Sequence, residues 1–175
     1  LYPWNPVLDM NETTTQFTTN RFLGTLFAEM QLMKDLKYRL NLGVDLKNTR
    51  KYNYVGSESA VNKASGLKGN GYNNWNKRFS KVMENILTYN HTWNKHRFDA
   101  LVGYNYQYNV NEGFGANNYD YPTDFYLWNN LGLGTALKDG KAGMSSYKND
   151  NTLIGFFGRV SYGYDNKYNV LLSVR

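Results

Sequence analysis

The sequence predicts an all-β chain: a segment of an antiparallel transmembrane β-barrel, with about six long strands. Three observations predict this fold. Apolar and polar residues alternate along most of the chain, the alternating runs reach about a dozen residues, and short connections alternate with long ones. Strands of soluble proteins are typically about 5–6 residues long. A tilted strand needs about 9–11 residues to cross a bilayer, so the long runs favour a membrane barrel.

The run over residues 36–47 is the clearest strand. Its even positions are apolar and its odd positions are mostly polar, in the order Leu36, Lys37, Tyr38, Arg39, Leu40, Asn41, Leu42, Gly43, Val44, Asp45, Leu46, Lys47. Successive side chains of a strand point to opposite faces of its sheet. One face of this strand is therefore apolar and the other is polar.

The same alternation recurs along the chain, more weakly over residues 79–93, where His91 interrupts the apolar face marked by Leu87, Tyr89 and Trp93. The expected strands span about residues 20–32, 36–47, 79–93, 97–108, 152–164 and 168–175. The connections at 33–35, 94–95 and 165–167 are tight turns, whereas those at 48–78 and 109–151 are long. Short turns on one side and long loops on the other are typical of outer-membrane barrels.

Aromatic residues gather near the expected strand ends, as at Tyr104, Tyr106, Tyr108 and Trp93. Tyrosine and tryptophan prefer the interface between membrane and water, so their placement also favours a barrel. Six strands cannot close even the smallest single-chain barrel, which has about eight. Both ends of the sequence resemble cuts, and we expect a piece of a larger chain. The alternative from another class is a soluble β-sandwich that serves as a surface binding or adhesion module.

The composition excludes several functions. There are 175 residues and no cysteine, so disulfide scaffolds and thiol catalysis are excluded. His91 and His96 flank one turn, but no carboxylate cluster completes a metal site there. Glu84 and Asp99 have no nucleophile or base beside them in the pattern, so we predict no enzyme and no cofactor.

The net charge of +6 raises the question of nucleic-acid binding. The strand arginines and lysines belong to the polar faces of different strands, however, and a barrel would place them around its lumen instead of in one patch. We therefore predict no nucleic-acid partner. The residues expected to face the lumen are Arg39, Asn41, Asp45, Arg97, Asp99 and Arg159.

Six short blocks follow one another in order along the chain. They are Asn20–Gly24, Leu40–Asp45, Glu84–Asn90, Asp99–Tyr104, Gly158–Tyr162 and Leu171–Arg175. Together these blocks resemble the barrel of the SusC/RagA family of TonB-dependent outer-membrane transporters, over essentially the whole chain. The resemblance implies a larger barrel of about 22 strands with a plug inside, in the outer membrane of a Gram-negative bacterium. It also implies the lipid bilayer, a SusD-like surface lipoprotein, the TonB complex and an oligosaccharide or peptide cargo as partners. The plug and the segment that contacts TonB are not among these residues.

In such a barrel the loops 48–78 and 109–151 would be extracellular, and residues 1–19, with Pro3 and Pro6, would end another outer loop. Five loop aromatics are then candidates for contact with a sugar or with the lipoprotein lid: Tyr72, Trp75, Tyr119, Tyr121 and Trp128. Aromatic faces suit sugar CH groups and protein partners alike. The alternative is that these rings pack the loops against each other.

Overall fold

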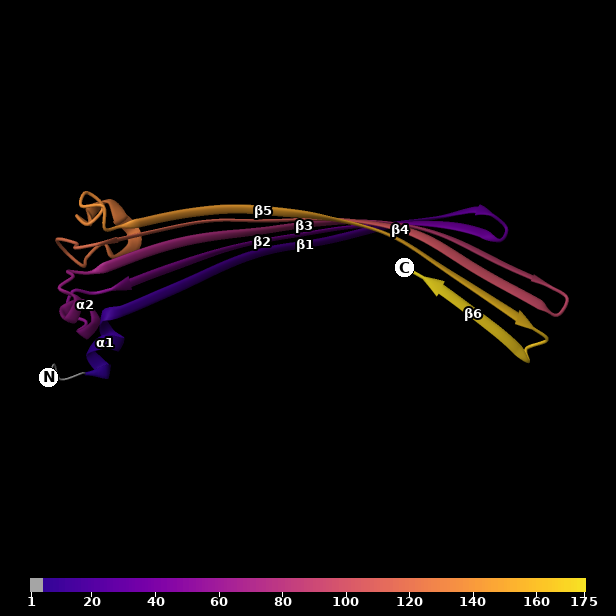
Figure 1. Ribbon diagram of the computed structural model, residues 1–175, viewed down its shortest axis with the longest axis horizontal. Coiled ribbons are helices and arrows are strands. Elements are labelled where there is room, and N and C mark those ends of the chain that lie inside the picture. Colours follow the sequence, from indigo (N-terminus) through magenta and orange to yellow (C-terminus); the bar gives the residue numbers. More distant parts are fainter. Residues whose placement is uncertain (1–4) are drawn as a thin grey trace. The chain divides into compact units, whose positions relative to one another are not determined.

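The structure is a computed structural model that describes residues 5–175, so Pro3 lies outside the described residues. The elements follow one another in chain order (Figure 1): α1 (Pro6–Glu12), β1 (Thr13–Met33), β2 (Leu36–Val55), α2 (Ala60–Ser65), β3 (Asn70–Trp93), β4 (His96–Tyr119), the 3₁₀ helix η1 (Leu127–Leu133), β5 (Gly143–Tyr164) and β6 (Tyr168–Val174). The strands form one six-stranded sheet in the order β1-β2-β3-β4-β5-β6. Each strand pairs with its neighbours in sequence.

The predicted all-β, antiparallel fold is confirmed. In the last hairpin, Gly158 lies opposite Val174 and Tyr164 lies opposite Tyr168. The sheet of this segment is open, because β1 and β6 each have a neighbour on one side only. No second sheet packs against it in the described part of the chain.

The strands are longer than the alternation indicated, at the ends away from the tight turns. β2 continues to Val55 and β4 to Tyr119, while β3 begins at Asn70 and β5 at Gly143. The parts of the two long connections outside strands are therefore only residues 56–69 and 120–142. The added strand residues are rich in Asn, Lys and Tyr on both faces, which removes the alternation. Backbone hydrogen bonds between neighbouring strands do not depend on apolar side chains, and they extend the sheet all the same.

The residues expected to end another outer loop also fold differently. Pro6–Glu12 forms α1, and β1 already begins at Thr13. Proline at the first helical position suits a helix start, because its missing N–H would have no partner there. The Asn5 side chain accepts hydrogen bonds from the backbone N–H groups of Val7 (3.1 Å) and Leu8 (3.4 Å), which caps the helix.

The chain divides into two compact units, each built from stretches that are distant in sequence. We call them the loop unit, which holds the described residues up to Arg21 with Lys47–Arg78 and Asn111–Asn149, and the turn unit, which holds Phe22–Leu46, Phe79–Val110 and Asp150–Arg175. The two long connections lie in the loop unit, and the three tight turns lie in the turn unit.

The turn unit leaves many large apolar side chains of one sheet face uncovered. Its exposed large side chains include Leu26 (67% exposed) and Phe156 (70% exposed), together with Phe22, Met30, Leu42, Val44, Val102, Ile154, Val160, Val170, Leu172 and Val174. The buried hydrophobic side chains of the described residues are Tyr54, Tyr121, Trp128 and Ala136, and all four belong to the loop unit. An uncovered apolar sheet face of this extent marks a surface that meets another apolar phase.

In the described part of the chain, no helix has both the length and the apolar character needed to span a membrane.

Candidate functional site

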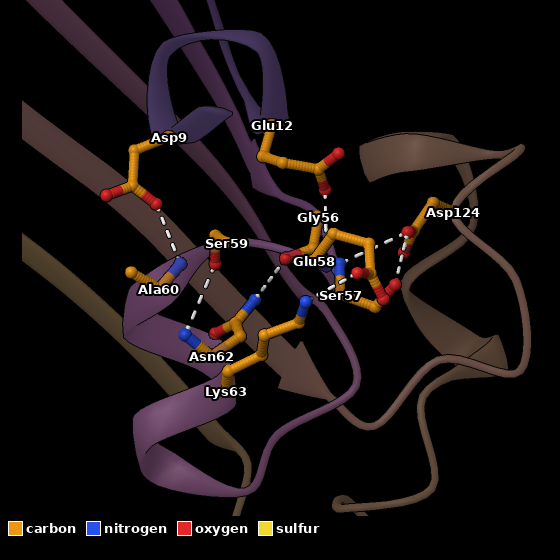
Figure 2. A network of polar contacts seen from close by, with 10 residues as sticks. All are labelled: Asp9, Glu12, Gly56, Ser57, Glu58, Ser59, Ala60, Asn62, Lys63 and Asp124. Atoms are coloured by element: carbon orange, nitrogen blue, oxygen red, sulfur yellow. Dashed lines mark hydrogen bonds and ion pairs between the residues drawn. The ribbon is translucent and has the colours of Figure 1, made fainter. Parts of the chain in front are cut away.

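The loop unit is organised around α2, which follows the end of β2 (Figure 2). Ser59 caps the helix, its Oγ accepting a hydrogen bond from the Asn62 backbone N–H at 3.2 Å. The Asn62 side chain is buried, and its Nδ2 donates to the carbonyls of Val55 (2.9 Å) and Gly56 (2.8 Å). These bonds hold α2 against the end of β2 and the residue that follows it.

Helix α1 joins the same network. The backbone N–H of Gly56 donates to the Glu12 carbonyl at 2.8 Å. The N–H of Ala60 donates to Asp9 Oδ1 at 2.7 Å (Figure 2). The start of the described chain is thereby tied to the connection between β2 and β3.

Asp124 is the polar centre of the loop unit. Its Oδ1 accepts a 2.7 Å hydrogen bond from the Tyr54 hydroxyl, and its Oδ2 accepts bonds from the Ser57 N–H (3.1 Å) and the Ser57 Oγ (2.8 Å). Burial by itself raises the pKa of the Asp124 carboxyl, but the bonds from Tyr54 and Ser57 outweigh it and hold this pKa below its usual value. Burial, together with the bond to Asp124, raises the pKa of Tyr54. The pair is therefore a carboxylate and a neutral phenol at neutral pH.

Two of the five predicted contact residues form the core of the loop unit. Tyr121 is 2% exposed and packs edge-on against Tyr54, with ring centroids 5.4 Å apart. Trp128 is buried and stacks on Tyr52 at 5.8 Å. Burial raises the pKa of Tyr121 to about 12, and its hydroxyl has no hydrogen-bond partner in the described structure. In this structure Tyr121 and Trp128 pack the loops together, which is the alternative that the sequence left open.

The other three predicted contact residues do not share one surface. Tyr72 and Trp75 lie three positions apart on β3, so their side chains point to opposite faces of the sheet. Trp75 lines a shallow hollow with Arg50, Tyr52, Asn73, Asn74 and Phe114. The Tyr119 hydroxyl, at the end of β4, accepts a 2.5 Å hydrogen bond from Asn117 Nδ2. A role for these three in contacting cargo or a lid stays a prediction.

The predicted lumen-facing residues gather in two groups on the polar face of the turn unit. Arg39 Nε donates to Asn41 Oδ1 at 2.9 Å, and Asn41 Nδ2 donates to Glu84 Oε2 at 2.8 Å. These three line one hollow together with Asp45 and with apolar side chains such as Leu23, Phe27 and Val82. Glu84 enters the group because of the register between β2 and β3, which the sequence pattern alone did not define.

The second group is a polar hollow that brings Arg97, Asp99 and Arg159 together. Arg97 Nε donates to Asp99 Oδ2 at 2.9 Å. The remaining lining residues are mostly small or polar: Thr88, Asn90, Ala100, Leu101, Ser161, Gly163 and Asn169. Such a surface suits a hydrated solute, through hydrogen bonds and charge. That it faces a barrel lumen stays a prediction.

The two histidines belong to a row of stacked rings next to the turns. His91 Nδ1 lies 2.7 Å from Asp35 Oδ2, and His96 Nδ1 lies 2.6 Å from the Tyr162 hydroxyl. Trp93 stacks between them, with centroids 5.4 Å from His91 and 5.2 Å from His96. Among residues 5–175 no group of three or more His, Asp or Glu side chains is placed to hold a metal ion. The row is instead an aromatic band of the kind expected at a membrane interface.

Comparison with known proteins confirms the predicted resemblance to TonB-dependent receptors. The chain is 26% identical over 171 residues to TonB-dependent receptor P3 of Formosa agariphila, and 25% identical over 181 residues to TonB-dependent receptor P26 of the same organism. These matches cover 98% and 97% of this chain but only 16% and 17% of the two receptors. The chain thus spans about one sixth of the length of these curated relatives. No family model matches the chain.

Solved structures with the same fold include the RagAB peptide transporter, at a TM-score of 0.83 and 21% identity over 93% of this chain and 18% of the other. The RagAB peptide importer in its closed-closed state is similar to the same degree, and its open-open state has a TM-score of 0.82. The fold is therefore that of a segment of a transmembrane β-barrel. The relatives named here are receptors and a transporter, and none of them is named as an enzyme.

Proposed function

We propose that this chain is part of the barrel wall of an outer-membrane, TonB-dependent transporter that imports a nutrient. The observation that carries the proposal is the division of the turn unit into two faces. One face exposes large apolar side chains on several strands, and the other holds most of the hydrogen-bonded polar groups, such as Asn41 with Glu84 and Arg97 with Asp99. A barrel wall needs lipid on one side and a hydrated lumen on the other. The similarity to TonB-dependent receptors over nearly the whole chain supports the same function.

The proposed orientation follows from the connections. The turns of the turn unit would face the periplasm, and the loop unit, with residues 56–69 and 120–142, would face the outside of the cell. The loop unit would then be the surface that meets a SusD-like lipoprotein lid. Energy would come from the TonB complex acting on a part of the protein outside this chain. The cargo would be an oligosaccharide or a peptide, and its proposed path passes the hollow formed by Arg97, Asp99 and Arg159.

Uptake by cells tests the proposal. Cells that carry the full-length protein should accumulate a labelled oligosaccharide or peptide mixture, and cells that lack the gene should not. Uptake should also stop when TonB is deleted or the proton gradient is dissipated. An uptake that persists in both conditions would exclude a TonB-dependent transporter.

The second function considered, a soluble β-sandwich for binding or adhesion, gains no support from the fold. A sandwich buries one face of each sheet against the other, whereas the described residues form a single sheet with its apolar face exposed.

A further inference from the structure

Lys81 is a cation on the apolar face of the turn unit. Its Nζ lies 5.2 Å from the ring centroid of Tyr108 and 5.9 Å from that of Tyr106, and the side chain is exposed. The even positions of β4 that carry these rings continue to Tyr104, whose ring packs against Phe156 at 5.2 Å. Phe156 belongs to the uncovered apolar surface. Lys81 and its two tyrosines therefore lie on the face that we propose meets lipid.

Lys81 lies at one edge of the apolar band, and Trp93 lies at the other. Both are odd positions of β3, so they share a face, and twelve residues separate them. At about 3.3 Å per residue and a tilt of about 40°, this separation is about 30 Å along the barrel axis. The hydrocarbon core of a bilayer is about 30 Å thick. If the stacked rings around Trp93 mark one interface, Lys81 marks the opposite one.

The Lys81 charge has no carboxylate partner. The ion pairs of the turn unit join other cations, namely Lys37 with Glu29, His91 with Asp35, Lys95 with Asp165, Arg97 with Asp99 and Lys167 with Asp165. The Asp150 carboxylate lies near the Tyr108 hydroxyl. The contacts of the Lys81 ammonium group in the described residues include the faces of the Tyr106 and Tyr108 rings.

We propose that Lys81, Tyr106 and Tyr108 form a binding site for the phosphate of a lipid headgroup, in the leaflet on the loop side of the membrane. The inference rests on the proposed function, because it needs the apolar face to meet a bilayer. The ammonium group donates charge-assisted hydrogen bonds to the phosphate. The two rings hold the ammonium through cation–π attraction, and the apolar residues beside them accept the acyl chains.

Lipid binding to the full-length protein in detergent micelles tests the site. The probes are dioleoyl phosphatidic acid and dioleoyl phosphatidylcholine, which have the same acyl chains, and native mass spectrometry measures the occupancy of each. We expect the native protein to prefer phosphatidic acid, and Lys81→Gln to reduce that preference roughly three- to tenfold. Lys81→Arg should keep most of the preference. Tyr106→Leu, which removes one ring and keeps the apolar bulk, should reduce it less than Lys81→Gln does.

The control is Lys95→Gln, because Lys95 lies in a turn, paired with Asp165 at 3.2 Å. It should leave the preference unchanged. The proposal is wrong if Lys81→Gln and the native protein show the same ratio of phosphatidic acid to phosphatidylcholine occupancy. That result is expected if the Lys81 ammonium group is hydrated and binds no phosphate. It is also wrong if excess inorganic phosphate displaces the lipid, because the site would then bind a free anion. Membrane fractionation of the same variants separates this result from a failure of the proposed function, which would leave the native protein outside the membrane.

Discussion

The Tyr54 hydroxyl donates a 2.7 Å hydrogen bond to Asp124 Oδ1 across 70 positions of sequence. Tyr54 is the next-to-last residue of β2, and Asp124 lies in the connection between β4 and β5. With Ser57 bound to the other oxygen of Asp124, the two long connections are pinned to each other at one carboxylate. The outer loops therefore form one packed unit with its own small core, instead of two independent flexible loops.

This arrangement predicts how the loop unit responds to acid. The folded-state pKa of Asp124 is lowered, so its contribution to stability is complete above the unfolded pKa of about 3.9 and is lost as the pH falls through the folded value. Hydrogen exchange of residues 56–69 and 120–142 in the full-length protein should stay slow from neutral pH down to about pH 5, after correction for the intrinsic rate. Protection should fall below about pH 4. Protection that is lost already near pH 6 would point to a different titrating group.

Asp124→Asn should destabilise the loop unit by about 1–3 kcal/mol. The amide can still accept from Tyr54, but its NH₂ group would face the two donors of Ser57, which lose their acceptor. Local hydrogen exchange at neutral pH measures the loss. Asp139→Asn is the matched control, because Asp139 is an exposed residue of the same loop unit, and it should change the exchange very little. Equal effects of the two substitutions would contradict the role given to Asp124.

Two glycines near this pair make a matched test of packing. Gly69 has a φ of +114°, and a Cβ placed there would lie 2.6 Å from the Tyr54 hydroxyl and 3.1 Å from Asp124 Oδ1. Gly66 has a φ of +69°, and a Cβ there would meet nothing within 4 Å. Gly66→Ala should therefore cost about 1 kcal/mol, the left-handed backbone penalty alone, and Gly69→Ala should cost about 1–3 kcal/mol more. Hydrogen exchange of the loop unit at increasing denaturant concentration measures both losses of stability. A cost of Gly66→Ala equal to or larger than that of Gly69→Ala would contradict the packing described here.

Protease added to intact cells tests the proposed orientation. Cuts in the full-length protein should fall within residues 56–69 or 120–142, where exposed chain lies outside strands. The turns at 33–35, 94–95 and 165–167 should stay intact. Mass spectrometry of the fragments locates the cuts. A strain that lacks surface lipoproteins serves as the control, because a lipoprotein lid could shield the loops from the protease. Cleavage only at the three turns would mean that the orientation is inverted.

Much of the sheet could be predicted from the sequence, because period two is strong wherever one face is apolar and the other polar. Residues 36–47 show this, and the hairpin at Asn94 begins and ends within a residue of the expected positions. The outer halves of the strands could not be predicted in the same way. Around Asn73 and Asn117 both faces are polar, so the side chains carry no alternation, although the backbone bonds of the sheet continue.

The candidate sites were predictable only in part. Arg97, Asp99 and Arg159 come together as members of one polar face, which the alternation of each strand had indicated. The bond from Tyr54 to Asp124 and the burial of Tyr121 depend on how two loops fold over each other. No local pattern encodes such a contact, since its partners lie 70 positions apart and Asp124 lies outside any helix or strand.

A pair of arginine substitutions in β2 tests which face meets lipid. Leu42 is 38% exposed on the apolar face, whereas Asn41 is bonded to Glu84 on the polar face. An arginine that faces lipid costs about 2–4 kcal/mol near the bilayer midplane and less toward the interfaces, and lumen positions tolerate charge. Leu42→Arg in the full-length protein should therefore reduce folded, membrane-inserted protein, measured by heat-dependent mobility in gels. Asn41→Arg should insert almost normally, and a similar loss for both would contradict the assignment of faces.

The most direct test of the membrane-wall account is a cysteine scan through residues 36–47 of the full-length protein, in a background without other cysteines. Each single cysteine is labelled and tested with a lipid-dissolved quencher and with a water-soluble reagent. We expect even positions such as Tyr38, Leu40 and Leu42 to be reached from the acyl phase, and odd positions such as Asn41 and Gly43 to be reached from water. If neither set is reached from lipid, this strand does not face a bilayer and the chain is not part of a membrane barrel.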